Sequence, residues 1–220
     1  MLFAIFFLSS FALFLAIIFL VIYPIVRRND YRENFLKKYG KKIYDIANKN
    51  DYYLINELSL KLNDDSLVNI DHLLLANKYL FLISDYYFEG TVENKIKDRS
   101  WIYYYGDYKK PNKMIIDNAL MVNDKRVKKF LKFTKFDKSF VISVVVVNND
   151  CKINELANND NDSYVVKIKN LEKLVKEIEG RDVGEIDQMQ LLNVVNELAN
   201  RNEKKWLKIH FHFIKRNLET

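Results

Sequence analysis

The side chains that could do metal chemistry by themselves are few in this sequence. Two histidines form the pattern His210-x-His212 near the C-terminus, and His72 is the third one in the chain. A protein metal site needs about three convergent side chains, and no third ligand stands at a recognisable spacing from the pair. The two histidines alternate with apolar residues over 209–213, as polar residues do on a half-exposed strand. We therefore expect incidental histidines rather than a metal centre.

A lone cysteine and a pair of glycines are also weak candidates. Cys151 is the single cysteine, which excludes an intramolecular disulfide framework and a cysteine-built zinc finger. It follows a turn-like Asn-Asn-Asp stretch without a histidine partner, so an unreactive thiol is expected rather than a nucleophile. The segment Gly180–Gly184 is too short for a phosphate-binding loop and does not end in Lys-Ser or Lys-Thr. It is interpreted as an ordinary loop.

Basic and aromatic residues gather in places where they could bind nucleic acid. The basic stretches cover 125–132, 135–138 and 204–216, but acidic residues interleave with them. This mixture favours solvated helix faces, and a basic face would also suit an anionic membrane surface. The aromatic residues at 86–87 and 101–105 are interpreted as sheet packing rather than as a platform for stacked bases.

The composition describes a folded and mildly basic chain with one apolar end. Its 220 residues contain 35 Lys and Arg against 29 Asp and Glu, a net charge of +6, and the mean hydropathy is −0.21. This length suits one globular domain with attachments. Aromatic residues make up 14% of the chain, which argues against disorder, and only 5 Gly and 2 Pro exclude collagen-like sequence.

The first 26 residues predict a transmembrane helix. They contain no charged side chain, since Arg27 is the first, and about 20 apolar residues are enough to cross a bilayer. A soluble core helix of this length would show a polar face. A cleaved signal peptide would have a basic start, a shorter apolar run and a small-x-small cleavage site. Both alternatives fit this segment less well.

The charges that flank this segment predict its orientation. Seven Lys and Arg residues lie between Arg27 and Lys42, and none precedes the apolar run. The positive-inside rule places that side in the cytoplasm. We therefore predict a single-pass protein of the cell membrane, with the N-terminus outside and the C-terminal body in the cytoplasm.

The body predicts a mixed α/β domain. Apolar residues at helical spacing indicate a helix over 27–49, which Gly40 interrupts or caps. Four runs rich in β-branched and aromatic residues then predict an antiparallel meander. They are 52–58, 68–76, 79–88 and 101–105, and a short turn at Asn77-Lys78 separates the second from the third.

The second half of the body alternates between helical and strand patterns. An amphipathic helix is predicted over 118–133, with Lys125, Arg126, Lys128, Lys129 and Lys132 on its exposed side. The apolar run 140–147 predicts a strand covered on both faces. A short strand over 164–168, a helix over 171–178 and a helix after Gly184 follow, whereas the periodicity of 206–213 stays open.

The order of these elements and several short motifs resemble the nuclease-related domain, NERD, a branch of the PD-(D/E)xK nuclease-like fold. The segment 69–75, Asn-Ile-Asp-His-Leu-Leu-Leu, matches the family's Ile-Asp-His before an apolar strand. The segment 81–90 lies where the family has an apolar strand, Glu-x-Lys and a glycine. Trp101 and the segment 118–123, which is similar to Asn-Pro-x-x-Gln-Asn, follow in order. The resemblance covers about residues 40–180 and implies a restriction-endonuclease-like α/β (α+β) domain with a mixed sheet.

The resemblance also implies where a nuclease site would lie. In such nucleases two carboxylates hold Mg²⁺ and a lysine supports the developing charge. Asp71 matches the first carboxylate, whereas Ser84 and Tyr86 stand at the acid and lysine positions. A register shifted by one residue would offer Asp85, but it would place Tyr87 at the lysine position. The vestigial positions implied by the family are Asp71, Ser84, Asp85, Tyr86, Tyr44 and Val122.

Three hypotheses about function follow. The first is a membrane-anchored cytosolic NERD-like domain without catalytic activity or cofactor, which binds or regulates a nucleic acid or a protein partner. The second is an active Mg²⁺-dependent nuclease that uses Asp71 with Asp85 or another carboxylate. The third is a single-pass membrane protein with an unrelated α/β fold. No small-molecule substrate is evident from the sequence.

The same reasoning divides the chain into four parts. We predict a transmembrane helix over 1–26, a juxtamembrane basic helix over 27–39 and a NERD-like domain over 40–180. A C-terminal extension then covers 181–220.

Overall fold

A computed structural model describes residues 2–23, 26, 34–61, 67–106, 109–134, 136–158 and 162–202. The chain divides into two compact units, Met1–Lys38 and Tyr39–Thr220. Most of the predicted juxtamembrane helix, residues 27–33, lies outside the described residues, as does the segment 206–213.

The first unit contains the apolar segment for which the sequence predicts a membrane helix. Helix α1 covers Leu2–Ile17, and a π-helical stretch, η1, follows directly at Ile18–Ile22. Of the helices in the described ranges, none combines the length and the apolarity that crossing a membrane requires.

Helix α3 (Phe35–Asn50) leads into the second unit. Its buried residues, Tyr39, Ile43, Ile46 and Ala47, recur at steps of three and four, so one face of the helix can enter the core. The helix continues through Gly40, so this glycine neither interrupts nor caps it.

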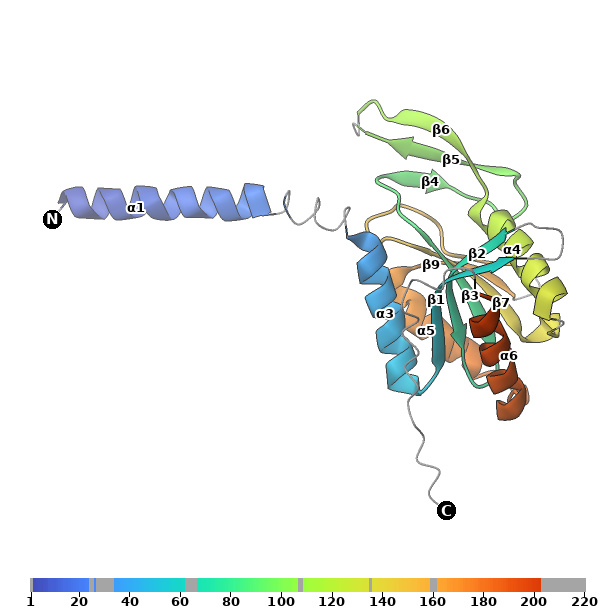
Figure 1. The fold of residues 1–220 in the computed structure, drawn as a ribbon. Helices are drawn as coiled ribbons and strands as arrows, with labels where there is room; N and C mark the ends of the chain where they lie inside the picture. Colours follow the sequence, from blue (N-terminus) through green and yellow to red (C-terminus); the bar gives the residue numbers. More distant parts are fainter. Residues whose placement is uncertain are drawn as a thin grey trace, which may run out of the picture. The chain divides into compact units, whose positions relative to one another are not determined.

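A six-stranded sheet forms the centre of the second unit, with the strand order β1-β2-β3-β7-β9-β8 (Figure 1). Strands β1, β2 and β3 form an antiparallel meander, while β3, β7 and β9 run parallel. The fold is therefore a mixed α/β fold, as predicted. The strands are β1 (Tyr53–Lys61), β2 (Leu67–Leu75), β3 (Leu80–Tyr86), β7 (Val141–Val147), β8 (Leu156–Ala157) and β9 (Ser163–Lys167).

Strand β7 is an inner strand between β3 and β9, which confirms the prediction made from its apolar sequence. All seven of its residues are buried. The sheet needs such a strand because both of its faces are covered at this point, and a run of valines packs well on both sides of a pleated strand.

The turn between β2 and β3 is also confirmed, although its sequence lacks the glycine that two-residue turns favour. The amide of Ala76 donates to the carbonyl of Tyr79 at 2.9 Å and closes the turn. The carboxylate of Glu179, at the end of helix α5 (Leu171–Glu179), accepts the amide of Lys78 at 3.1 Å. Tertiary contact with α5 therefore supports a turn that is weak by local sequence alone.

The prediction that residues 101–105 form the fourth strand of the meander is wrong. This run belongs to a separate antiparallel sheet made of β4 (Thr91–Glu93), β5 (Ser100–Tyr105) and β6 (Asn112–Asp117), with β5 in the middle. The reason is that β7 occupies the second edge of β3, where a fourth antiparallel strand would have to pair. Strand β6 was not anticipated because its exposed and mixed sequence carries no strand periodicity.

Three helices complete the unit, and all three match predicted ones. Helices α4 (Ala119–Thr134) and α6 (Gln188–Arg201) add side chains such as Phe130 and Val195 to one apolar cluster with the sheet. Helix α5 is tied to α3 through Glu172, which accepts from Lys49 at 2.9 Å and from Lys42 at 3.2 Å. Hydrogen bonds from Lys49, from Lys176 on α5 itself and from Lys42 lower the pKa of Glu172 to about 2.

Candidate functional site

The structure places Asp71 and Ser84 on the neighbouring strands β2 and β3, as predicted. The pairing of these strands ends at His72 and Ile83. Beyond that point the amide of Asp85 donates to Oδ2 of Asp71 at 3.2 Å instead of to a backbone oxygen. The carboxylate of Asp71 thus takes the place of a backbone acceptor where β2 and β3 separate. This opening between the two strands is the candidate site.

A cation that the sequence did not indicate lies in this opening. Nη1 of Arg126 is 3.4 Å from Oδ2 of Asp71 and donates to Oγ of Ser84 at 2.6 Å. The side chain of Arg126 is 28% exposed and that of Asp71 is 38% exposed. The prediction that Arg126 lies on the solvent face of its helix is therefore wrong. Arg126 is four residues after Val122, one helical turn along α4, so the two share a helix face.

A chain of hydrogen bonds among buried polar groups holds Arg126 in place. Oγ of Ser84 accepts from Arg126 and donates to Oδ1 of Asn123 at 2.7 Å. The amide nitrogen of Asn123 then donates to the carbonyl of Leu82 at 3.1 Å and to Oγ of Ser143 at 3.0 Å. Asn123 is only 1% exposed, and its direct hydrogen bonds connect α4 to β3 and β7 in the interior of the unit.

Tyr86, for which the resemblance implies a lysine, lies close to the same charges. Burial raises the pKa of its phenol, the charge of Arg126 opposes that rise, and the charge of Asp71 adds to it. A neutral phenol cannot supply the positive charge of a lysine. Arg126, from a different element, supplies the one positive charge paired with Asp71 among the described residues.

Asp85 does not turn its carboxylate toward Asp71 for a shared metal ion. Its Oδ2 lies 2.6 Å from Nε2 of His72, and Nδ1 of His72 lies 2.6 Å from Oδ1 of Asn56. The side chain of Asp85 is 1% exposed, and its Oδ1 has no hydrogen-bond partner within the described residues. Burial raises the pKa of this carboxyl, His72 opposes the rise, and Asp71 adds to it.

The two remaining positions that the resemblance implies are Tyr44 and Val122. Tyr44 is half-buried on α3, beside the buried Ile43. Val122 is half-buried on α4 and has no polar side-chain atom, so it cannot orient a metal ligand. The functional neighbour is the next residue, Asn123, which closes the motif 118–123.

The other asparagine of that motif has a structural role. Oδ1 of Asn118 accepts the amide of Leu120 at 2.9 Å and so caps the first turn of α4. Its Nδ2 donates to backbone oxygens of the segment before β5, including that of Asp98 at 2.7 Å. Asn118 therefore fixes the start of the helix that carries Asn123 and Arg126.

The described residues do not form a metal centre. No group of three His, Cys, Asp or Glu side chains within the described ranges is arranged to hold a metal ion. In the opening itself Asp71 faces a guanidinium and a serine hydroxyl, which is a poor donor set for Mg²⁺ because the ion prefers several hard oxygen ligands. His210 and His212 lie outside the described residues.

Cys151 lies within the apolar cluster around Trp101 and is 0% exposed. Burial raises the pKa of its thiol to about 11. The thiolate is the reactive form, so this environment gives the unreactive thiol that the sequence suggested.

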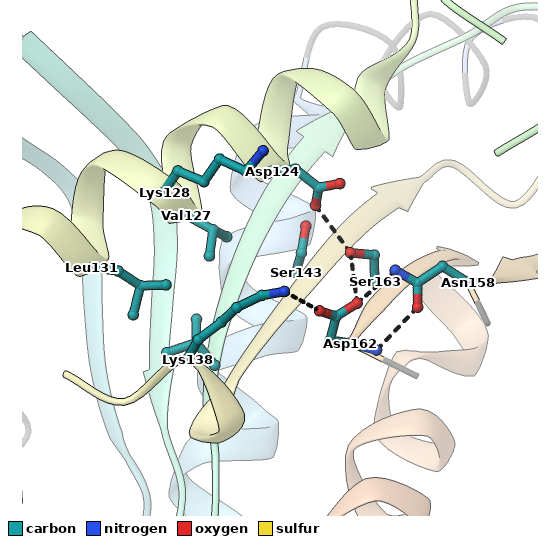
Figure 2. Close-up of a pocket in the computed structure, with 10 residues that line it drawn as sticks. Asp124, Val127, Lys128, Leu131, Lys138, Ser143, Asn158, Asp162 and Ser163 are labelled. Atoms are coloured by element: carbon teal, nitrogen blue, oxygen red, sulfur yellow. Dashed lines mark hydrogen bonds and ion pairs between the residues drawn. The ribbon is translucent and has the colours of Figure 1, made fainter. Parts of the chain in front are cut away.

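A pocket of about 170 Å³ lies between α4 and the beginnings of β7 and β9 (Figure 2). Ser143, which accepts from Asn123, is one of its lining residues. Three of its four charged lining residues, Asp124, Lys138 and Asp162, already have hydrogen-bond or ion-pair partners inside the pocket. Ser163 donates to Asp124 at 2.9 Å, and Lys138 lies 3.2 Å from Asp162, whose other oxygen accepts from Asn158 at 2.5 Å. We therefore assign no chemistry to this pocket.

Comparison with known proteins identifies the family. The model of the nuclease-related domain, NERD, matches residues 31–148, more than half of the 220-residue chain. No curated protein and no solved structure matches the chain. The matched range includes the strands that carry Asp71 and Ser84 and the helix that carries Asn123 and Arg126. The chain therefore belongs to the NERD family of nuclease-related domains.

Proposed function

We propose that this protein is a catalytically inactive NERD domain that binds a partner and is held at the cell membrane by its N-terminal segment. The proposal includes the restriction-endonuclease-like arrangement that the family implies. The observation that carries it is the guanidinium of Arg126, which contacts both Asp71 and Ser84 in the opening between β2 and β3.

The charge balance of the opening supports inactivity. Mg²⁺ in a phosphate-cleaving site is usually held by one or two carboxylates, oriented water and the substrate. Here the single carboxylate of Asp71 is compensated by Arg126, and Ser84 contributes a neutral hydroxyl. A metal ion would have to displace or approach a bound cation, which costs electrostatic energy.

The engagement of Asp85 supports the same conclusion. In the alternative hypothesis Asp85 joins Asp71 as the second ligand. Its carboxylate is instead buried against His72, and it is the Asp85 amide that meets Asp71. A further carboxylate that acts electrostatically at the opening is that of Asp117, whose charge raises the pKa of Tyr86, and it is exposed at the end of β6.

A binding role is supported by the outer surface of α4. Lys125, Lys128, Lys129 and Lys132 are exposed or half-exposed along the helix whose inner side holds the opening. Lysines in such a row attract the phosphates of a nucleic acid or an acidic protein surface. The scaffold would thus keep its recognition surface after losing metal-dependent chemistry.

The nuclease assay is the first test. The purified full-length chain, with Mg²⁺ or Mn²⁺, should not cleave single-stranded or double-stranded DNA or RNA, because Asp71 lacks a second carboxylate. Titration with Mn²⁺ should reveal no saturable site below millimolar concentration. The Asp71→Ala variant is the matched control and should behave as the parent does.

Metal-dependent cleavage that disappears in Asp71→Ala would overturn the hypothesis of an inactive domain. The variants Asp85→Asn and Asp117→Asn would then show which carboxylate completes the site.

Attachment to the membrane is the second part of the proposal. The described apolar side chains of the first unit are largely exposed, with Phe11 at 55%, Phe19 at 67% and Leu20 at 75%. Such a continuous apolar surface is unfavourable in water and suits a lipid environment. The positive charges begin only at Arg27, which supports a cytoplasmic body.

Reporter fusions test this orientation. A reporter that is active only in the cytoplasm should give a signal when fused after Thr220, and a reporter that requires export should not. Replacing the basic residues from Arg27 to Lys42 with glutamine should weaken the preference, because lysine and arginine near the membrane set the orientation. Signal from the exported reporter alone would contradict the proposal.

A further inference from the structure

Strand β6 presents an open edge on the smaller sheet. Within the described residues it pairs with β5 only, and it forms the outer edge of that sheet in Figure 1. Five of its six residues are exposed. Ile115 is 72% exposed and Met114 is 45% exposed. Natural proteins usually shield an edge strand of this kind, because its free backbone groups can pair with another strand.

The sequence of β6 is complementary to itself. Lys113, Ile115 and Asp117 alternate along the strand, so they share one face of the sheet. When two copies of β6 run antiparallel about Ile115, Lys113 of each copy lies opposite Asp117 of the other. The two Ile115 side chains then meet at the centre. Opposite charges and apolar side chains in directly opposed positions both stabilise a strand pair.

The charges on this face are available for such pairing. Neither the Lys113 nor the Asp117 side chain has a hydrogen-bond or ion-pair partner in the part of the chain that the structure describes. A single lysine on an edge strand normally discourages pairing with other strands. The matching aspartate removes that protection against one partner in particular, which is a second copy in this register.

We propose that this protein forms a symmetric dimer in which the β6 strands of two copies pair antiparallel about Ile115. The two small sheets become one continuous sheet of six strands. The interface is isologous, because the same residues contribute from both copies. With one strand per copy it is smaller than a standard stable interface, so the dimer is a weak and reversible one.

Disulfide cross-linking of the full-length chain in the expressing cell tests the proposal. Directly opposed residues of antiparallel strands have Cα atoms about 4.5–5.5 Å apart, which lies within the range that a disulfide needs. The variant Ile115→Cys should therefore form a covalent dimer on mild oxidation, seen on a non-reducing gel. Ile115 is exposed, so the substitution leaves the core intact.

Two controls measure random collision. The parent chain carries only the buried Cys151 and should not cross-link. The variant Met189→Cys places a thiol at a position on α6 that is 66% exposed. We expect at least a fivefold higher dimer yield for Ile115→Cys than for Met189→Cys. Equal yields would overturn the proposal.

Charge reversal tests the register. In the Ile115→Cys chain, Lys113→Asp places two aspartates opposite each other on both sides of the axis, and Asp117→Lys does the same with lysines. Each change alone should reduce the cross-linked yield severalfold, and the two together should restore it. The pairing about Ile115 would be overturned if the single changes left the cross-linked yield unaltered, or if the combination did not restore it.

Discussion

Replacing Asn123 with alanine should lower the free energy of unfolding by about 3 kcal/mol. The amide of Asn123 accepts from Ser84 and donates to Ser143 and to the carbonyl of Leu82. Alanine makes none of these bonds, and its small side chain leaves the buried partners without access to water. Each buried polar group that loses its partner costs about 1–3 kcal/mol.

Thermal unfolding of the full-length chain in mild detergent measures this loss. The chain has two tryptophans, and the fluorescence of Trp101, which is 0% exposed, contributes a signal from the core. For a chain of this size a loss of 3 kcal/mol lowers the melting temperature by about 6–12 °C. Lys125→Ala on the exposed side of the same helix is the matched control and should change stability by less than about 0.5 kcal/mol. Equal melting temperatures for the two variants would show that the polar network does not stabilise the fold.

Much of the larger sheet could be predicted from the sequence because its signals are local. The valine run of β7 indicates a strand covered on both faces, and the period of α4 is clear between Leu120 and Leu131. The sequence could not tell which sheet residues 101–105 join, because strand pairing depends on contacts far apart in the chain. The edge strand β6 gave no signal because neither of its faces is deeply buried.

The candidate site could be predicted only in part, for a similar reason. Asp71 and Ser84 lie on strands that sequence order brings together, so their proximity was foreseeable. Arg126 lies on helix α4, 42 residues after Ser84 in the chain. It was one of several basic residues along α4, and only the packing of α4 against β3 distinguishes it from the lysines beside it. Its position one turn after Val122 was the available signal.

The replacement of Asp85 by alanine should be the second large loss of stability, also about 3 kcal/mol. The carboxylate of Asp85 lies 2.6 Å from Nε2 of His72, and both side chains are buried. Removal of one partner from a buried polar pair leaves the other without compensation, and this is costly even where the intact pair adds little net stability. Melting temperatures should therefore fall strongly for Asp85→Ala and much less for Asp85→Asn, which keeps the shape and a polar contact.

A double-mutant cycle separates the contact from the effects of each side chain alone. Asp85→Ala and His72→Ala should each destabilise the protein, and the double variant should lose less than the sum. The difference should be about 1–3 kcal/mol, as is usual for groups in direct contact. Strictly additive losses would mean that the two side chains contribute independently.

The pH dependence of this pair has a definite sign. Burial raises the pKa of Asp85 above its ordinary value of 3.8 in the folded chain, so folding favours the protonated carboxyl. The contribution of Asp85 to stability is then fully present below the pKa of the unfolded chain and is lost as the pH rises through the folded pKa. The stability of the parent relative to Asp85→Asn should therefore fall from about pH 4 upward.

His72 limits this loss, because its hydrogen bond and charge oppose the rise in the pKa of Asp85. In a His72→Gln background the effect of the histidine charge is gone, while the hydrogen bond can be kept. The melting temperature of the chain that keeps Asp85, minus that of the Asp85→Asn variant, should then keep falling to higher pH than it does in the parent background. If this signed difference instead rises with pH, in either background, folding stabilises Asp85 as a carboxylate. Asp85 would then remain available as an anionic ligand beside Asp71, and the nuclease hypothesis would regain its second carboxylate.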